Sequence, residues 1–349
     1  MSSDEKPEVT SARAEFYGRI DQDHLTPLWD VMKDIITPEP KSGCRAHLWQ
    51  YDRLRPFLME AGELITAREA ERRVLILENP GLRGQSRITT SLYAGLQLVL
   101  PGEVAPAHRH SQTALRFVLE GEDAHTTVEG EKTLMRPGDF VITPPMAWHD
   151  HGNGSDKPMV WLDGLDIPML SFFDASFAEP YTAEEQPVGR NTGDSLARYG
   201  ANMLPVDFEA TGQASPIFNY PYARSREALH RMARQEEWDP CHGLKLRYTN
   251  PRDGGFAMPT MATFLQLLPK GFESAPYRAT DATVFTVVEG FGRSEIDGEW
   301  FTWGPKDIFI APSWKWVRHQ AGEDAVIFSF SDRAAQQKLG FWREERQKN

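Results

Sequence analysis

Three histidines between Gly102 and Asn153 have the residue type and the spacing of a metal site. His108 and His110 are one residue apart, so on a β-strand their side chains point to the same face. His149 follows the turn-rich segment 144–146, which can bring it back to the same point. Three neutral imidazoles on one face suit a first-row divalent metal with open coordination positions. We therefore predict that His108, His110 and His149 hold a metal ion.

The residues around these histidines have a recognisable spacing. The first part is Gly102-x5-His108-x-His110 followed by Gly121, and the second is Gly138-x5-Pro144-x4-His149-x3-Asn153. This pattern resembles the two signatures of the cupin family, whose fold is a small double-sheet jelly-roll barrel. Cupins usually supply a glutamate four residues after the second histidine, and that position here is Ala114. The metal would then have three histidines and no carboxylate.

Within the cupins, the chain resembles the gentisate 1,2-dioxygenases, most strongly from about Arg72 to Pro168. The matching segments are Glu78–Arg87, Ser91–Gln97, Leu115–Phe117 and Trp161–Asp166. The resemblance implies Fe(II), one per chain, and opening of gentisate between the carboxyl- and 2-hydroxyl-bearing carbons to give maleylpyruvate. It also implies a small aromatic hydroxy-acid and O2 as reaction partners, and a homotetramer.

This ligand set fits a chelating substrate. Three histidine ligands leave open positions, two for the carboxylate and 2-hydroxyl of a 2-hydroxybenzoate and one for O2. Salicylate or 1-hydroxy-2-naphthoate would chelate in the same way, so both remain alternative substrates. A bicupin that binds a metal or a sugar without catalysis is the alternative from a different class.

Two further residues are candidates for substrate binding and proton handling. Arg116 has the parity of His108 and His110, and a buried guanidinium needs an anion such as a substrate carboxylate. The alternative is a core arginine paired with Asp163 or Glu120. His151 is our candidate to hydrogen-bond the substrate and handle its proton. It is also a possible third ligand, although the cupin spacing favours His149.

Four other residues complete the predicted substrate pocket. Arg72 precedes the apolar run 74–77 and is a candidate mainly through the resemblance. Tyr93 and Gln97 share the mixed face of one predicted strand, where they could instead face another layer. Asp163 is a catalytic candidate because a carboxylate often orients an imidazole, here His151; the alternative is a structural turn acid.

The composition limits the class of protein. The net charge of -12 argues against nucleic acid as a partner. There is no run of eighteen apolar residues to span a membrane and no apolar segment typical of a secretory signal at the N-terminus. The only two cysteines are far apart in sequence and match no metal-binding spacing. These features favour a cytoplasmic protein with neither nucleic acid nor membrane as a partner.

The periodicity predicts a mainly β protein with an N-terminal helical segment, and the resemblance implies that its barrels are two cupin domains, a bicupin. We expect helices in residues 1–86, including one over Ala70–Leu77 that begins with the capping box Thr66-Ala-Arg-Glu69. Strand-like runs at short intervals then predict a metal-binding barrel over 87–170. Residues 171–240 are expected to be a linker and edge elements, with a helix over Ser225–Gln235.

An internal repeat predicts the second barrel, over residues 241–349. The interval from Gly271 to Gly290 equals that from Gly102 to Gly121. At the positions of His108, His110 and His149, the second copy has residues that leave it without a metal site: Tyr277, Ala279 and Val317. We expect this pocket to be partly closed by Tyr277, Phe285 and Trp316.

Overall fold

The computed structural model describes residues 10–235 and 237–347, and the chain divides into two compact units, residues 1–41 and 42–349. The described part of the first unit contains helices α1 (Ser11–Gln22) and α2 (Leu28–Ile35). Thr10 caps α1, because its hydroxyl oxygen accepts a hydrogen bond from the Arg13 amide at 3.3 Å. The helices predicted at this end of the chain are therefore present.

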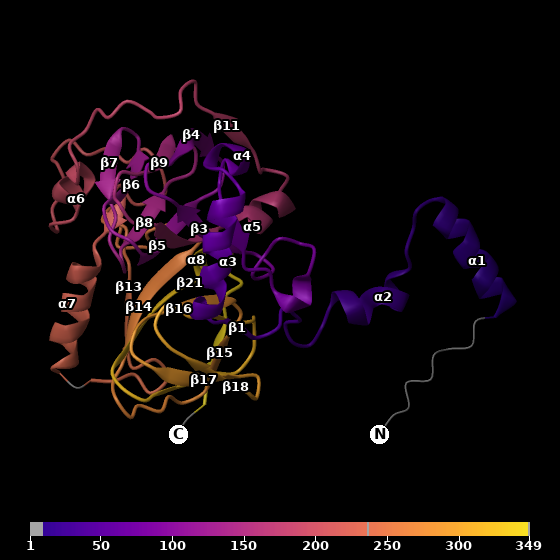
Figure 1. Ribbon diagram of the computed structural model, residues 1–349. Helices are drawn as coiled ribbons and strands as arrows, with labels where there is room; N and C mark the ends of the chain where they lie inside the picture. Colours follow the sequence, from indigo (N-terminus) through magenta and orange to yellow (C-terminus); the bar gives the residue numbers. More distant parts are fainter. Residues whose placement is uncertain (1–9, 236, 348–349) are drawn as a thin grey trace. The chain divides into compact units, whose positions relative to one another are not determined.

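The second unit consists of two β-barrels, each made of a six-stranded and a five-stranded sheet (Figure 1). The orders are β12-β8-β5-β10-β3-β2 and β11-β4-β9-β6-β7 in the first barrel. They are β1-β19-β16-β21-β14-β13 and β18-β17-β20-β15-β22 in the second. The expected bicupin fold is confirmed.

The first barrel contains the strands β2 (Val74–Ile76), β3 (Tyr93–Val99), β4 (Val104–His110), β5 (Ala114–Glu120), β6 (Ala124–Val128), β7 (Glu131–Leu134), β8 (Phe140–Thr143), β9 (His149–Asn153), β10 (Met159–Leu165), β11 (Ala178–Pro180) and β12 (Asn219–Tyr220). The second barrel contains β1 (His47–Trp49), β13 (Leu244–Arg247), β14 (Ala262–Leu268), β15 (Tyr277–Ala279), β16 (Thr283–Glu289), β17 (Gly292–Ile296), β18 (Glu299–Trp303), β19 (Ile308–Ala311), β20 (Val317–Ala321), β21 (Ala325–Ser331) and β22 (Glu344–Arg346). The helical elements of this unit are α3 (Tyr51–Leu64), α4 (Ala67–Ala70), η1 (Pro80–Leu82), α5 (Ile167–Phe172), α6 (Asp194–Tyr199), α7 (Tyr222–Ala233) and α8 (Arg333–Lys338).

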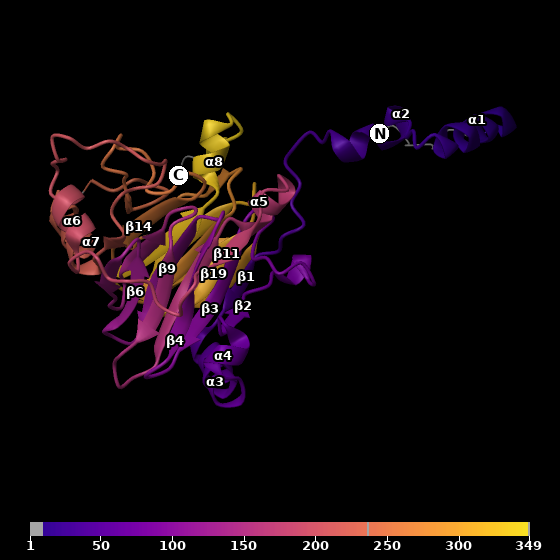
Figure 2. The same ribbon diagram turned by 90° about the horizontal axis from the view of Figure 1, so that it is seen from above.

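The two six-stranded sheets pack against each other, and Figure 2 shows the strands of both barrels side by side. The largest core cluster joins residues of both sheets, and the rings of Phe117 and Phe328 stack within it at 4.1 Å. Strand side chains alternate, so the opposite face of each six-stranded sheet lines the interior of its own barrel. On β3 the apolar face, including Leu96, enters this shared core and leaves Tyr93 and Gln97 on the interior face.

Each barrel receives one strand from the segment that precedes the other barrel. Strand β1 comes before the first barrel in the chain but pairs with β19 of the second. Strand β12 comes before the second barrel but pairs with β8 of the first. Residues 171–240, predicted as a linker and edge elements, also contribute β11, which pairs with β4. The connecting segments thus complete the two sheets on which the site is built.

Helix α3 connects the two barrels through its first turn. The Tyr51 amide donates to Asp307 Oδ1 at 2.8 Å in the second barrel. The Tyr51 hydroxyl donates to Glu120 at 3.0 Å in the first barrel, and Arg55, one turn later, also binds Glu120. Helix and barrels are thereby held by charge-assisted hydrogen bonds.

Helix α7 repeats this arrangement with the barrels exchanged. The Tyr222 amide donates to Asp139 Oδ1 at 2.9 Å in the first barrel. Its hydroxyl and Arg226 both bind Glu289 in the second barrel. The internal repeat therefore extends beyond the barrels to the helix that precedes each of them. The helix predicted over Ser225–Gln235 is present, shifted a few residues towards the N-terminus.

One predicted helix is wrong in extent. The Thr66 hydroxyl does accept from the Glu69 amide at 3.2 Å, but the helix ends at Ala70 because Glu71 takes a φ of 52°. Residues Val74–Ile76 form β2 beside β3 instead of continuing the helix. Branched apolar side chains favour this pleated edge position. Within 10–235 and 237–347, every helix is too short or too polar to cross a lipid bilayer.

Candidate active site

The structure brings the three predicted histidines together inside the first barrel. His108 and His110 lie on β4, and His149 lies directly opposite His108 on the neighbouring strand β9. One ring nitrogen from each histidine lies within 4.8 Å of the others. The cluster therefore arises because side chains alternate along β4 and because the register of β9 places His149 opposite His108.

The three rings are oriented by their own backbone. In each ring Nδ1 faces a carbonyl oxygen two residues away: Pro106 at 3.3 Å from His108, Gln112 at 3.0 Å from His110 and Ala147 at 3.0 Å from His149. Because a carbonyl only accepts, Nδ1 of His110 and of His149 carries the hydrogen and Nε2 keeps its lone pair, whereas Nδ1 of His108 also contacts Nη2 of Arg72, which only donates. Nε2 of His149 is buried without a hydrogen-bond partner among the described residues. A divalent metal ion would satisfy this nitrogen, so the donor set fits such an ion.

The environment keeps these imidazoles neutral. Burial lowers the pKa of His108 to about 3, and the nearby Arg72 guanidinium acts in the same direction. Burial and Arg116 lower the pKa of His110 to about 4. The pKa of His149 is also well below its ordinary value, mainly through burial. Neutral rings offer the lone pairs that a metal needs.

Arg116 lies inside the barrel, as its parity predicted, and only 3% of its surface is exposed. Its Nη1 donates to the Thr143 hydroxyl at 2.7 Å, whereas Nε lies 3.8 Å from Asp163 Oδ1. That separation is an ion pair but not a hydrogen bond, and Nε has no hydrogen-bond partner among the described residues. Burial lowers the pKa of Arg116 to about 10, so the guanidinium stays charged at neutral pH.

Arg72 lies beside the histidine cluster. Its Nη2 donates to the Pro106 carbonyl at 2.5 Å and contacts Nδ1 of His108. Burial and the positive charge of Arg116 lower the pKa of Arg72 to about 10. The neighbouring Arg73 points elsewhere and binds Glu103. The pocket thus has two arginines that repel each other, a charge distribution that favours an anion.

Tyr93 and Gln97 face the same interior from β3. Gln97 is buried, and its Nε2 has no hydrogen-bond partner in the described part of the chain. Tyr93 is half-buried; burial raises its pKa and the nearby Asp163 carboxylate raises it further. Gly95 lies between them, and a Cβ there would come within 3.1 Å of the Tyr93 hydroxyl and 2.4 Å of Val74. Our sequence analysis missed Gly95, although a glycine inside a strand often marks a close approach.

His151 is also buried in this interior, and its ring centre lies 5.6 Å from that of His149. Its Nδ1 lies 2.9 Å from the Thr126 hydroxyl. Our expectation that Asp163 orients His151 is therefore corrected, because Asp163 accepts from Trp161 Nε1 at 2.9 Å and pairs with Arg116. Thr126 lies opposite His151 on β6, whereas Asp163 belongs to the other sheet.

Comparison with known proteins agrees with this geometry. Residues 95–165 match the family model described as a cupin domain. The chain is 64% identical over 346 residues to gentisate 1,2 dioxygenase 1 of Aquipseudomonas alcaligenes, covering 99% of this chain and 100% of that protein. The chain belongs to the gentisate 1,2-dioxygenase family. The expected enzyme class, a ring-cleaving dioxygenase, is confirmed by this membership, and a metal cofactor follows from it and the histidine cluster.

The family extends to relatives with other named substrates. A 5-aminosalicylate 1,2-dioxygenase of Comamonas sp is 35% identical, covering 92% of this chain and 87% of that protein. Among solved structures, a salicylate 1,2-dioxygenase from Pseudoaminobacter salicylatoxidans, in adducts with gentisate, superimposes with a TM-score of 0.94 at 33% identity. That match covers 100% of this chain and 98% of the other.

The second barrel has the family fold with different side chains at the metal positions. Tyr277 lies opposite Val317, as His108 lies opposite His149. The Tyr277 hydroxyl lies 3.4 Å from Nε2 of the buried His319, whose ring also contacts Phe285. Tyr277 and Phe285 fill this interior as predicted. Trp316 does not, because its half-exposed ring packs against the guanidinium of Arg278 on β15.

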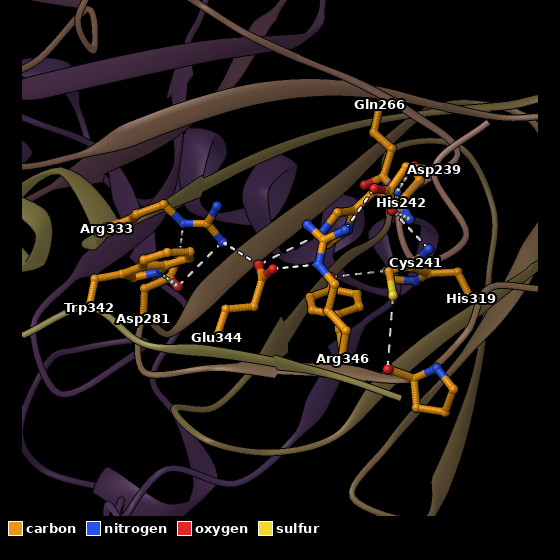
Figure 3. A network of polar contacts seen from close by, with 12 residues as sticks. Asp239, Cys241, His242, Gln266, Asp281, His319, Arg333, Trp342, Glu344 and Arg346 are labelled. Carbon is orange, nitrogen blue, oxygen red and sulfur yellow. Dashed lines mark hydrogen bonds and ion pairs between the residues drawn. The ribbon is translucent and has the colours of Figure 1, made fainter. Parts of the chain in front are cut away.

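A network of polar contacts involves strand β22 and helix α8 of the second barrel (Figure 3). Glu344 on β22 accepts from Arg346 at 2.5 Å, and Arg346 also binds Asp239 at 2.7 Å. Arg333 on α8 pairs with the buried Asp281 at 3.2 Å. These arginines form close ion pairs with carboxylates of the same chain, whereas Nε of Arg116 in the first barrel lies 3.8 Å from Asp163 and has no hydrogen-bond partner among the described residues. Of the two barrels, the first therefore has the better-suited pocket for an anionic substrate.

Proposed function

We propose that this chain is an Fe(II)-dependent dioxygenase that opens gentisate between the carboxyl- and 2-hydroxyl-bearing carbons to give maleylpyruvate. The observation that carries the proposal is the cluster of three neutral imidazoles whose Nδ1 atoms each face a backbone carbonyl. The relative named gentisate 1,2 dioxygenase 1, at 64% identity over the whole chain, supports gentisate as the substrate.

Iron is favoured by the reaction class together with the ligands. Imidazole ligands suit Zn, Cu, Fe and Ni, so the donor atoms alone do not select one metal. A dioxygenase needs a metal that changes its oxidation state, which zinc does not do. When bound by His108, His110 and His149, Fe(II) supplies the redox chemistry with O2 and a Lewis acid for the substrate oxygens. We expect one Fe(II) per chain.

Arg116 is proposed to bind the substrate carboxylate. Its guanidinium is charged and buried and has donors that Asp163, at 3.8 Å, does not satisfy. A carboxylate can accept two parallel hydrogen bonds from such a group. Arg72 supplies a second positive charge at the pocket. Together the arginines orient the substrate by its carboxylate, which decides which ring carbons face the metal site.

The remaining residues are assigned to the ring substituents. Tyr93 and Gln97 face the pocket from β3, where the unpaired Nε2 of Gln97 is available to donate a hydrogen bond. His151 is neutral, because burial and Arg116 keep its pKa well below the ordinary value. Its ring can therefore accept the proton of a substrate hydroxyl, and the O–H electron pair stays on the oxygen. Asp163 acts through Arg116, whose position it holds.

Salicylate and 1-hydroxy-2-naphthoate are the second candidates, with the same chemistry. The observation that favours them is the overall match to the salicylate 1,2-dioxygenase, with a TM-score of 0.94. A 1-hydroxy-2-naphthoate 1,2-dioxygenase of Nocardioides sp. is 33% identical to this chain. Salicylate and 1-hydroxy-2-naphthoate lack the 5-hydroxyl of gentisate, so kcat/KM across such a panel separates the candidates.

Oxygen uptake by the ferrous protein tests the proposal. We expect one O2 consumed per gentisate, with a ring-opened product and no uptake in a His108→Ala control. If iron-loaded protein consumes no oxygen with gentisate, salicylate or 1-hydroxy-2-naphthoate, the chain is a binding protein and the proposal is wrong. The homotetramer and the cytoplasmic location stay predictions; light scattering of the purified protein tests the first.

A further inference from the structure

The hydrogen bond at Nδ1 of His151 decides which of its nitrogens carries the proton. Thr126, fully buried on β6, places its hydroxyl 2.9 Å from this Nδ1. The same hydroxyl lies 3.3 Å from the thioether sulfur of Met135, just after β7. Nδ1 is thus engaged by the neighbouring strand, and Nε2 is the nitrogen left for the pocket.

The chemistry of these partners gives the hydrogen bonds a direction. A thioether sulfur only accepts, so the Thr126 hydroxyl donates to Met135 and its oxygen accepts from His151 Nδ1–H. Nε2 then presents a lone pair to the pocket. In the opposite arrangement, Nε2–H would add a positive dipole close to Arg116 and Arg72, whose positive charges already act on His151. The first arrangement also makes two hydrogen bonds where the second makes one.

The second barrel contains the same pair of residues with a different third partner. Ser294 lies opposite His319, as Thr126 lies opposite His151, and its hydroxyl is 2.8 Å from His319 Nδ1. At the place of Met135 stands Trp303, whose Nε1 donates to the Ser294 hydroxyl at 2.8 Å.

An indole N–H only donates, so the Ser294 hydroxyl hydrogen is left for Nδ1 of His319. When that hydrogen is donated to Nδ1, His319 carries its own hydrogen on Nε2, which lies 3.4 Å from the Tyr277 hydroxyl. Exchange of an acceptor, Met135, for a donor, Trp303, therefore reverses the tautomer of the equivalent histidine.

We propose that Thr126, held by Met135, is a positioning residue that keeps His151 in the Nδ1–H tautomer, so that Nε2 accepts a hydrogen bond from the substrate 2-hydroxyl. The proposal rests on the proposed function for the presence of a hydroxylated substrate at His151. The tautomer itself does not depend on the substrate, and the two parts can be tested separately.

Neutron diffraction of deuterated protein tests the tautomer directly. We expect deuterium on Nδ1 and none on Nε2 of His151, and deuterium on Nε2 and none on Nδ1 of His319. The second barrel is an internal control in the same crystal. Deuterium on Nε2 of His151 would overturn the proposal even if the protein cleaves gentisate. The expected pattern in a protein without ring-cleaving activity would instead overturn the proposed function alone.

Kinetics with gentisate test the consequence for turnover. Thr126→Val keeps the shape but removes the acceptor for Nδ1–H, and we expect kcat to fall roughly 10–100-fold with iron content unchanged. Thr126→Ser keeps the hydroxyl and should recover kcat to within about threefold of wild type. Wild-type kcat in the valine variant, or a serine variant as impaired as valine, would overturn the role of the hydroxyl.

Two further variants separate tautomer from packing. Met135→Leu conserves volume but leaves the Thr126 hydroxyl free to donate to His151, so kcat should fall although Thr126 is intact. Ser294→Ala removes the equivalent hydroxyl in the second barrel, and we expect unchanged kcat. An unchanged kcat in Met135→Leu would show that Met135 does not direct the hydroxyl. This variant also keeps the proposal testable if Thr126→Val does not fold.

Discussion

Arg116 and Asp163 face each other on the neighbouring strands β5 and β10, with the guanidinium Nε 3.8 Å from the carboxylate Oδ1. Asp163 already accepts a hydrogen bond from Trp161. Burial raises the pKa of Asp163 to about 6, against the attraction of Arg116, so at neutral pH it remains mainly ionised. The aspartate therefore steadies Arg116 without using all of its donors, and a substrate carboxylate can take the rest.

Replacing Arg116 tests this arrangement. Arg116→Ala removes the buried partner of the substrate carboxylate, a loss of roughly 2–5 kcal/mol. We expect kcat/KM for gentisate to fall more than about tenfold, because each factor of ten corresponds to about 1.4 kcal/mol. Steady-state oxygen uptake measures the effect, with iron content as the control for an intact metal site. Wild-type kinetics in the folded variant would remove Arg116 from the substrate site.

His151 is expected to act on turnover and not on metal binding. Its Nδ1 is engaged by Thr126, and the metal-facing cluster consists of His108, His110 and His149. His151→Ala should therefore retain iron close to the wild-type level and lose most of its kcat. Metal analysis and oxygen uptake on the same sample give both values. Loss of the iron would mean that His151, and not His149, is the third ligand.

We expect one iron per chain at saturation. Only the first barrel places three potential metal-binding nitrogens together among the described residues, while Tyr277 and Val317 occupy the opposing positions in the second. Metal analysis of iron-reconstituted protein should approach one equivalent, and His108→Ala should bring it close to zero. Tyr277→Phe is the matched change in the second barrel and should leave one equivalent. Two equivalents, or one surviving in His108→Ala, would reveal a site elsewhere.

Stability in acid should depend on Glu120. Hydrogen bonds from Arg55 hold the pKa of Glu120 below its ordinary value, with Tyr51 acting in the same direction. A carboxyl with a lower pKa in the folded state stabilises the protein above its unfolded pKa, and this contribution is lost as pH falls through the folded pKa. Glu120→Gln should thus reduce the free energy of unfolding at neutral pH and have less effect below about pH 4. Urea titrations at several pH values measure this difference.

Arg55→Met provides the control for that prediction, because it removes the hydrogen bonds while keeping the carboxyl group. It should raise the pKa of Glu120 and reduce the same pH-dependent part of the stability. An equal loss of stability at every pH in both variants would show that packing of α3, and not the ion pair, holds the helix on the barrel.

The metal cluster and the bicupin architecture follow from local features of the sequence. His108 and His110 share a face because strand side chains alternate, and this holds wherever the strand lies in the fold. The spacing around His149 and the repeated glycine intervals marked two copies of one barrel. The same parity placed Arg116 inside the barrel, where the structure has it.

The partners of the site residues were decided by the tertiary structure. Asp163 was expected at His151 because a carboxylate often orients an imidazole, yet strand pairing places it opposite Arg116 and places Thr126 opposite His151. Likewise, the composition of Val74–Ile76 fits a helix or a strand. The segment is a strand because it pairs with the edge of β3. Alternation is a property of one strand and can be read from its residues. Register and strand order join residues far apart in the chain, so they depend on how the whole barrel closes.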